Sequence, residues 1–142
     1  MSTTTSRSLP RQKYASIIIA DLNELKTTND TLGHQAGDAL IRRAAEVLKA
    51  NFDGEYTAAR IGGDEFVIIL PGLDEQAAAE IIMRLQELIA LNNKYYREPE
   101  LSISLGAATS QPGVSLEKVI SLADHAMYHS KTEHHQRRST DK

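Results

Sequence analysis

The alternation of hydrophobic and polar residues divides the first third of the chain into a strand and a helix. The segment from Ser16 to Leu22 is short and contains three consecutive isoleucines, which predicts a buried β-strand that ends at Asp21. The stretch from Gln35 to Phe52 has apolar residues at helical spacing with charged residues between them, which predicts an amphipathic helix. The polar residues that lead up to Gly33 are expected to form a turn.

Two further short strands are predicted in the middle of the chain. One runs from Tyr56 to Ile61 and the other from Glu65 to Leu70. Between them, Gly62 and Gly63 permit the positive φ angles that tight hairpins require. A β-hairpin is therefore expected, with Asp64 at its tip.

The last part of the chain predicts a helix, a strand and a second helix. Asp74 can cap a helix whose apolar stripe comprises Ala78, Ile81, Ile82, Leu85, Leu88 and Ile89. From Leu101 onward apolar residues alternate with others, which predicts a strand. Ser115 is expected to cap the final helix, whose inward side would carry Leu116, Val119, Ile120, Ala123 and Met127.

The order strand, helix, hairpin, helix, strand, helix matches a split βαβ or ferredoxin-like α+β core, with an added C-terminal helix. Its sheet is mostly antiparallel and is flanked by helices. In this topology the first two strands run parallel, with the third antiparallel between them. Asp21 at the exit of the first strand and Asp64 at the hairpin tip are therefore expected to be neighbours.

Length and composition narrow the class of protein. A chain of 142 residues suits one domain, and 41% hydrophobic with 25% charged residues is typical of a soluble globular protein. A net charge of −3 disfavours a nucleic-acid partner. The absence of cysteine excludes disulfides, thiolate catalysis and cysteine zinc sites, and fits a cytoplasmic location.

No apolar run approaches the roughly 20 residues that span a bilayer, so this domain is expected to make no membrane contact. A cytoplasmic domain of a larger, membrane-anchored protein remains an open alternative. Residues 1–12 are expected to be a flexible lead-in or an expression remnant, residues 13–133 the folded domain, and residues 134–142 a flexible tail.

Two carboxylates that converge at one edge of a sheet can bind a hard divalent cation. Mg²⁺ commonly takes one or two carboxylates together with substrate phosphates and water. The pair Asp21 and Asp64 is weak evidence alone, because an Asp at the end of a strand more often caps a turn.

Two sequence motifs add to this evidence. Residues 61–66 read IGGDEF and follow Arg60, and residues 21–38 read DLNELKTTNDTLGHQAGD. Together they resemble the GGDEF family of diguanylate cyclases, in the expected order and at the expected separation. The resemblance extends from about Ser16 to Lys131, which makes residues 13–133 the expected catalytic domain.

The resemblance implies a palm-type nucleotidyl cyclase fold and a Mg²⁺-dependent enzyme, with Mn²⁺ as a possible substitute. Such an enzyme condenses two GTP molecules into cyclic di-GMP and releases pyrophosphate. Because each domain binds one GTP, it also implies an active homodimer. A sensor domain is expected elsewhere in the full-length protein.

The family's metal ligands match Asp21, the backbone carbonyl of Leu22, and Asp64, all of which are oxygen donors. Asp64 also matches the proposed proton acceptor for the attacking 3′-hydroxyl. Glu65 could assist the metal or the base, or be a solvated hairpin acid. Lys26 matches a residue that stabilises charge on the transferring phosphates, with a solvated lysine as the alternative.

The implied substrate-binding residues are Asn29, His34, Asp38, Gly62, Gly63 and Lys131. The Asp38 carboxylate can accept hydrogen bonds from N1 and N2 of guanine, which adenine does not present, and Asn29 offers both a donor and an acceptor. His34 matches a further substrate contact, or bonds its own turn. The two glycines would let the backbone approach the nucleotide. Lys131 matches a lysine that reaches the phosphates.

The sequence departs from the family pattern in several places. His134, His135 and Gln136 stand where a glycine, an arginine and an asparagine are usual, so a second cationic phosphate contact is missing. Asn23 replaces a frequent second Asp at a tolerant position, and the family's usual opening is absent from residues 1–15. The alternative function is therefore a catalytically weak or inactive GTP-binding regulatory module.

Two other features of the sequence argue against an inhibitory product site and a second metal site. The window Asp53 to Tyr56 carries an acid where the family's inhibitory product site has an arginine, so no tight product inhibition is expected there. His125, His129 and Glu133 recur every four residues, but they are interpreted as a solvated polar face rather than metal ligands.

Overall fold

The computed structural model describes residues 15–50 and 56–141. The elements in chain order are β1 (Ala15–Leu22), α2 (Leu25–Leu32), α3 (His34–Ala50), β2 (Thr57–Arg60), β3 (Glu65–Pro71), α4 (Glu75–Tyr95), β4 (Ile103–Thr109) and α5 (Leu116–Asp141). None of the described helices combines the length and apolarity needed to span a bilayer.

The four strands form one sheet in the order β2-β3-β1-β4, and every neighbouring pair is antiparallel. The predicted α+β class is therefore confirmed. So is the predicted topology, because β3 lies between β1 and β2 and runs against both. The register pairs Asp21 of β1 with Glu65 of β3 on one side and with Ser104 of β4 on the other.

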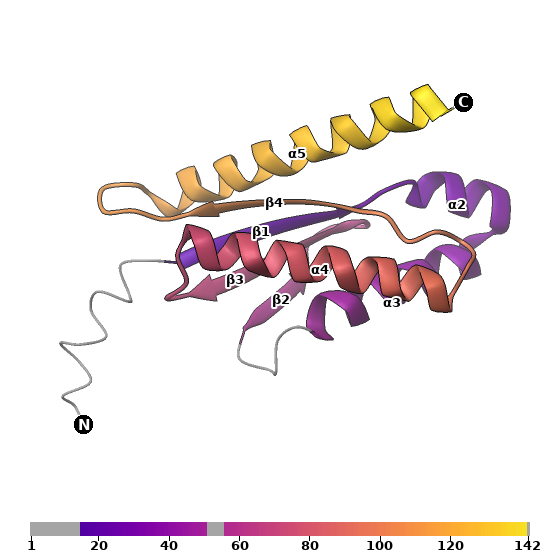
Figure 1. The fold of residues 1–142 in the computed structure, drawn as a ribbon, viewed down its shortest axis with the longest axis horizontal. Coiled ribbons are helices and arrows are strands. Elements are labelled where there is room, and N and C mark those ends of the chain that lie inside the picture. The colour runs from indigo at the N-terminus through magenta and orange to yellow at the C-terminus, as the bar shows by residue number, and fades with distance from the viewer. Residues whose placement is uncertain (1–14, 51–55, 142) are drawn as a thin grey trace.

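Helices cover both faces of the sheet, with α5 on one face and α3 and α4 on the other (Figure 1). Successive residues of a strand point to opposite faces, which explains why β1 is apolar throughout. Ile18, Ala20 and Leu22 pack in the larger core with α3 and α4. Ile17 and Ile19 pack in the smaller core under α5.

The region before Gly33 is helical, so the predicted turn there was wrong. The helix α2 buries only Thr28, and its other side chains are mostly polar, so no apolar stripe marks it in the sequence. Its limits are set by backbone conformation, with Glu24 at φ 60° and Gly33 at φ 94°. Packing against α3 stabilises the helix in place of intrinsic propensity.

The later helices mostly follow the prediction. Asp74 Oδ1 accepts a hydrogen bond from Ala77 N at 2.9 Å, and Ser115 Oγ accepts one from Lys118 N at 3.1 Å, so both predicted caps are confirmed. Three members of the α4 stripe are fully buried and three are half-buried against the core.

The inward face of α5 is narrower than predicted. Val119, Ala123 and Met127 are buried, but Leu116 and Ile120 are 60% and 40% exposed, so their predicted burial was wrong. The reason is that α5 contacts the sheet along a single line of residues four apart. The helix also continues to Asp141, past the expected domain limit at residue 133.

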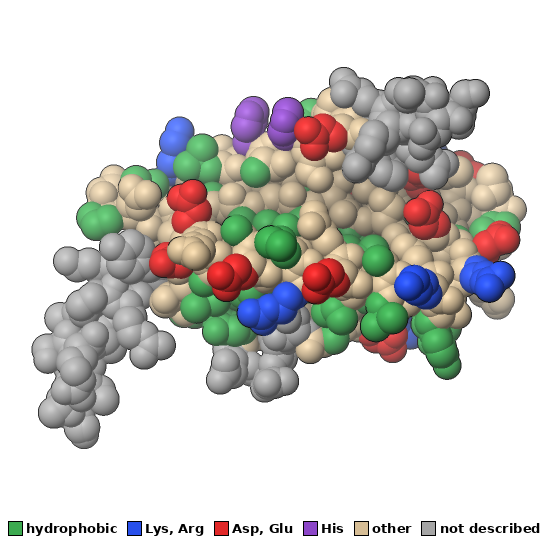
Figure 2. All heavy atoms as spheres, in the orientation of Figure 1, with side chains coloured by type: hydrophobic (Ala, Val, Ile, Leu, Met, Phe, Trp, Pro, Cys, Tyr) green, Lys and Arg blue, Asp and Glu red, His purple; other side chains and the backbone are tan. Residues whose placement is uncertain are grey.

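The surface that bears α4 carries charged side chains of both signs with apolar ones between them (Figure 2). Histidine side chains lie exposed over α5 in the same view. The pair His129 and Glu133 is 3.8 Å apart, with side chains 76% and 62% exposed. These residues form a solvated face, as expected for the side of α5 that points away from the sheet.

Candidate active site

The exit of β1 and the tip of the β2–β3 hairpin meet at one end of the sheet. Leu22 N donates a hydrogen bond to Asp64 O at 2.8 Å, immediately beyond the last β1–β3 pair, Asp21 with Glu65. The antiparallel pairing of β1 with β3 brings these four residues together. Asp21 and Asp64 are therefore neighbours, as the topology predicted.

The Asp21 side chain is 16% exposed, and its Oδ1 atom is buried without a hydrogen-bond partner. Burial raises the pKa of Asp21, and the nearby Asp64 adds to the increase, although the charge of Lys131 opposes it. Buried polar atoms normally have a hydrogen-bond partner, so a buried carboxylate oxygen that has only the Lys131 ammonium at 3.5 Å indicates a position that suits a cation.

Glu65 belongs to the same acidic group. Burial raises the pKa of Glu65, and the negative charges of Asp124, Asp21 and Asp64 raise it further. Asp124 lies on α5, and sequence reasoning did not single it out. Its influence on Glu65 shows that α5 contributes negative charge as well as Lys131 to this end of the sheet.

The oxygen donors fit a hard divalent cation. Within the described residues, no three acidic or histidine side chains are grouped so that they alone could hold a metal. Two carboxylates and a backbone carbonyl would leave the remaining positions to phosphates and water, which is the usual arrangement for Mg²⁺.

Lys131 reaches this end of the sheet from α5. Its Nζ donates to Asn23 Oδ1 at 3.0 Å and lies 3.5 Å from Asp21 Oδ1. Asn23 is 2% exposed and also bonds Ser102 and Ser104. Sequence reasoning gave Asn23 little weight. The sequence holds one signal for its role. An Asn follows a buried apolar strand directly, and two serines, Ser102 and Ser104, stand at alternating positions at the start of another strand.

The helices α2 and α3 carry the predicted base-binding residues. Gly37 allows them to cross closely, because a Cβ at Gly37 would overlap Asn29 Oδ1. The Asn29 amide therefore lies against the residue that precedes Asp38. The side chains of Lys26, His34 and Asp38 are exposed.

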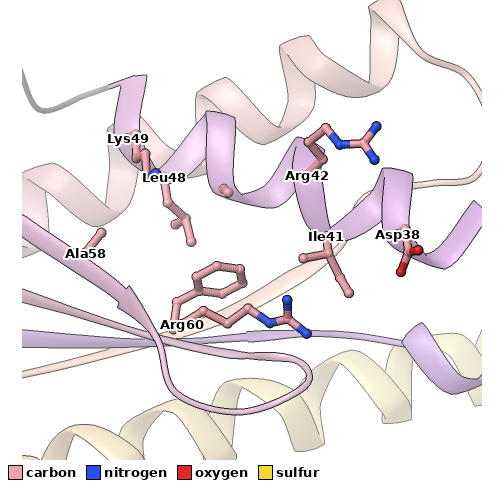
Figure 3. A pocket seen from close by; sticks show the side chains of 9 residues that line it. Asp38, Ile41, Arg42, Leu48, Lys49, Ala58 and Arg60 are labelled. Atoms are coloured by element: carbon pink, nitrogen blue, oxygen red, sulfur yellow. The ribbon is translucent and has the colours of Figure 1, made fainter.

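A cavity of about 380 Å³ lies between α3 and the strands β2 and β3 (Figure 3). Its apolar lining is formed by Ile41, Ala45, Leu48, Ala58 and Phe66. Asp38 and Arg60 also line it, and the Arg60 side chain extends toward Ile41, whereas that of Arg42 points away from the strands. Arg60 Nε donates to Gly62 O at 2.9 Å, which ties this cavity to the glycine loop.

These features can be compared with those of known proteins. The family described as "Diguanylate cyclase, GGDEF domain" matches residues 1–137. The chain belongs to the GGDEF family. The match covers almost all of the chain, so the family assignment applies to the whole described fold.

Relatives and solved structures agree with this assignment. The GGDEF domain described here is 29% identical over 131 residues to "Diguanylate cyclase A" of Treponema denticola, a match covering 90% of this chain and 35% of that protein. An uncharacterized protein of Bacillus subtilis, YtrP, is 35% identical over 116 residues, which cover 80% of this chain and 19% of that protein. This GGDEF domain thus spans only a minor part of these curated relatives.

Among solved structures, the GGDEF domain of DgcB from Caulobacter crescentus, in complex with c-di-GMP, superposes with a TM-score of 0.77 at 28% identity. The match covers 92% of this chain and 80% of that one. The EAL/GGDEF domain protein from M. capsulatus superposes with a TM-score of 0.70 at 32% identity, covering 85% of this chain and 80% of that one.

The glycine loop of this GGDEF domain differs from the predicted tight hairpin. Neither Gly62 nor Gly63 has a positive φ, so the conformational reason given for them was wrong. A hydrogen bond from Ile61 N to Glu65 O at 2.9 Å closes the loop. Three residues lie between these two, and in this wider loop the glycines have no positive φ angle. A Cβ at Gly63 would meet nothing within 4 Å, so the chain itself does not require glycine there. The space above the loop is open to a ligand.

Several sequence predictions fall outside the described residues. These are the lead-in at 1–12 and the acidic window from Asp53 to Glu55. The side chains of His134, His135 and Gln136 are likewise not described, although their backbone belongs to α5.

Proposed function

We propose that this GGDEF domain condenses two GTP molecules into cyclic di-GMP and releases pyrophosphate. The observation that carries the proposal is the meeting of the β1 exit with the hairpin tip. There Asp21, whose buried Oδ1 has no hydrogen-bond partner, lies beside Asp64, and that oxygen is 3.5 Å from the Lys131 ammonium. Family membership supplies the chemistry to which this geometry is suited.

The metal would be Mg²⁺, with Mn²⁺ as an alternative, because all the available donors are oxygens. Asp21, the carbonyl of Leu22 and Asp64 would hold it. When bound, a divalent cation neutralises charge on the phosphates and helps to orient them.

In the reaction, the 3′-oxygen of each GTP attacks the α-phosphorus of the other, so the bond changes described next occur twice and two pyrophosphates leave. The new O3′–P bond forms as the bond from that phosphorus to the pyrophosphate oxygen breaks. Asp64 accepts the proton of the 3′-hydroxyl, with Glu65 beside it as a second acid. Lys131 and Lys26 stabilise the negative charge that develops on the phosphates.

The guanine base would be bound by α2 and α3. The Asp38 carboxylate accepts from N1 and N2 of guanine, and Asn29, held against Gly37, offers its amide nearby. His34 at the start of α3 is a further substrate contact. Gly62 and Gly63 keep side chains out of the path of the phosphates, since a Cβ at either position would lie in open space or in ordinary contact.

One domain binds one GTP, whereas the product contains two guanosine units. Two copies would therefore meet face to face in a two-fold symmetric dimer. The catalytic unit would be residues 13–133, located in the cytoplasm. It would form part of a longer protein with a sensor domain, since the curated relatives are much longer than this chain. One solved structure of similar fold is a diguanylate cyclase "in complex with its activator".

A second candidate function is a GTP-binding regulatory module without turnover. The observation that favours it is the replacement of the usual arginine by His135 in the sequence. A neutral imidazole near pH 7 lacks the permanent charge of a guanidinium.

The two candidates are separated by incubating concentrated protein with GTP and Mg²⁺ and resolving the nucleotides by chromatography. The proposal predicts cyclic di-GMP and two equivalents of pyrophosphate, both absent when EDTA is added. Metal-dependent GTP binding without either product would favour the regulatory module.

A further inference from the structure

Asn23 is the most completely hydrogen-bonded buried side chain near the proposed site. Its Nδ2 donates to Ser102 Oγ and Ser104 Oγ, each at 3.0 Å. Its Oδ1 accepts from Ser104 Oγ at 3.2 Å and from Lys131 Nζ at 3.0 Å. The amide therefore joins three elements, the exit of β1, the start of β4 and the helix α5.

This network determines where the Lys131 ammonium lies. A lysine side chain has four rotatable bonds and would otherwise sample many conformations. The short contact of Nζ is with the amide oxygen of Asn23, because the distance to Asp21 Oδ1 is 3.5 Å and Asp21 Oδ1 has no hydrogen-bond partner. The amide oxygen holds the ammonium, and Asp21 attracts it from a greater distance.

Position 23 needs an oxygen that accepts from Lys131, and an amide oxygen provides it without cancelling the ammonium charge. The carboxylate that is frequent at this position in the family can accept from the ammonium in the same way.

We propose that Asn23 is a positioning residue, which holds the Lys131 ammonium beside Asp21 where it can receive the phosphates of GTP. This inference rests on the proposed function, since it takes the triphosphate to be the ligand of Lys131. Ser102 and Ser104 act with Asn23, because they determine which way the amide faces.

A double-mutant cycle tests the inference by a readout other than turnover. The dissociation constant of a non-hydrolysable GTP analogue with Mg²⁺ would be measured by calorimetry for wild type, Asn23→Ala, Lys131→Met and the double variant. We expect Asn23→Ala to weaken binding about tenfold in the wild-type background and less than about twofold in the Lys131→Met background. An equal loss in both backgrounds would show that Asn23 acts only through the fold, and would overturn the inference.

The isosteric variant Asn23→Asp provides a second test if Asn23→Ala fails to fold. Its carboxylate can accept from Lys131 and from both serine hydroxyls, so the ammonium should stay in place, and the melting temperature and the affinity for the analogue (within about twofold) should both be retained. Gln76→Glu is the matched charge control, because Gln76 is exposed near the start of α4, which follows the opposite end of β3. A folded Asn23→Asp protein that loses affinity for the analogue about tenfold, as expected for Asn23→Ala, would contradict the inference.

Failure of the inference can be told apart from failure of the proposed function. If the wild type does not bind the analogue in the presence of Mg²⁺, both are wrong. If the wild type binds and the two residues are not coupled, only the role of Asn23 is wrong.

Discussion

Asp21, at the end of β1, shows how a residue of the proposed cation site can lower the stability of the chain. Asp21 is mostly buried, has one orphaned oxygen, and lies near other acids. A carboxylate in this position is poorly solvated, and Lys131 compensates for it only partly. Residues selected for binding a ligand are expected to carry such a cost to stability.

The first prediction concerns Asp21→Asn in metal-free protein. Because burial raises the pKa of Asp21 above the ordinary 3.8, the folded state disfavours the ionised form relative to the unfolded chain. Stability is therefore lost as the pH rises from the unfolded pKa through the folded pKa, and a neutral amide avoids that loss. We expect the Asp21→Asn variant to melt slightly higher than wild type at about pH 7 in EDTA, with little difference near pH 3.

Adding metal should reverse the order of the two melting temperatures. Added Mg²⁺ should raise the melting temperature of the wild type, because a cation that binds only the folded state stabilises it. The Asp21→Asn variant should respond much less. A variant that is less stable than wild type at neutral pH in EDTA would contradict this account of Asp21.

The second prediction concerns Gly37→Ala. The new methyl group would overlap the Asn29 side chain, which can rotate away, so the fold should be retained with a small loss of stability. Asn29 would then be displaced from its place against residue 37, which precedes Asp38. We expect the KM for GTP to rise several-fold, measured by initial rates of pyrophosphate release.

The matched background for this test is Asn29→Ala, in which the displaced side chain is already absent. Gly37→Ala should add little to the KM there, because interacting residues are not additive. An equal rise in both backgrounds would show that Gly37 acts without Asn29.

At the scale of elements, α5 packs closely against β4 at Gly106, which has no side chain. A Cβ at Gly106 would overlap backbone atoms of Met127 and Ala123, which cannot rotate away as a side chain can. The close approach of the two backbones brings Lys131, one turn beyond Met127, to the end of the sheet where Asp21 and Asn23 lie. The position of Lys131 thus depends on a residue without a side chain.

The third prediction is that Gly106→Ala moves α5 away from the sheet. We expect a loss of about 1–3 kcal/mol in the free energy of unfolding, since an added methyl group in a packed core forces the backbone to shift. Binding of a GTP analogue should weaken as well, because Lys131 leaves Asn23. Chemical denaturation and calorimetry would measure the two effects.

Ala107→Gly is the control, because Ala107 packs on the opposite face of the sheet. It should lower stability by about 0.5–1 kcal/mol through glycine's greater backbone freedom and leave nucleotide binding unchanged. If Ala107→Gly weakened binding as much as Gly106→Ala, the position of α5 would not be the cause.

The helices and strands differ in how well the sequence predicts them. The strands were predictable because their apolar runs are short and bounded by polar residues, and the sheet order followed from their sequence. The helix α2 was missed because it buries only Thr28 and is stabilised by its neighbour. Asn23 was undervalued because its importance comes from Ser102, Ser104 and Lys131, which are distant in sequence and meet only in the folded chain.

The two sequence motifs identified the candidate residues, and the order of the strands predicted which of them lie close together. The meeting of Asp21 with Asp64 follows from the antiparallel third strand between the first two, which sequence order alone predicts. The conformation of Gly62 and Gly63 could not be predicted, because the same glycines suit both a tight turn and an open loop.

At the scale of the whole molecule, the site described here is half of what the proposed reaction needs. In the proposed reaction one chain would supply one set of metal, phosphate and base ligands, whereas joining two GTP molecules requires two sets face to face. Activity should then depend on how often two loaded domains meet.

The fourth prediction is that specific activity rises with protein concentration. Below the dissociation constant of the dimer, doubling the protein should increase the rate of cyclic di-GMP formation about fourfold, as expected for a second-order encounter. Initial rates over a roughly hundredfold dilution, with sedimentation in parallel, would check this. Constant specific activity together with a monomeric sedimentation coefficient would contradict a catalytic dimer.

The central claim is that the carboxylates at the meeting of β1 and the hairpin carry out cyclic di-GMP synthesis. It is tested most directly by comparing cyclic di-GMP formation by wild type and Asp64→Asn at equal, high concentration with GTP and Mg²⁺. An amide is a poorer ligand for Mg²⁺ and a far weaker proton acceptor, so the account predicts a rate at least about 100-fold lower, with an unchanged melting temperature. A folded Asp64→Asn protein that makes cyclic di-GMP at close to the wild-type rate would contradict it.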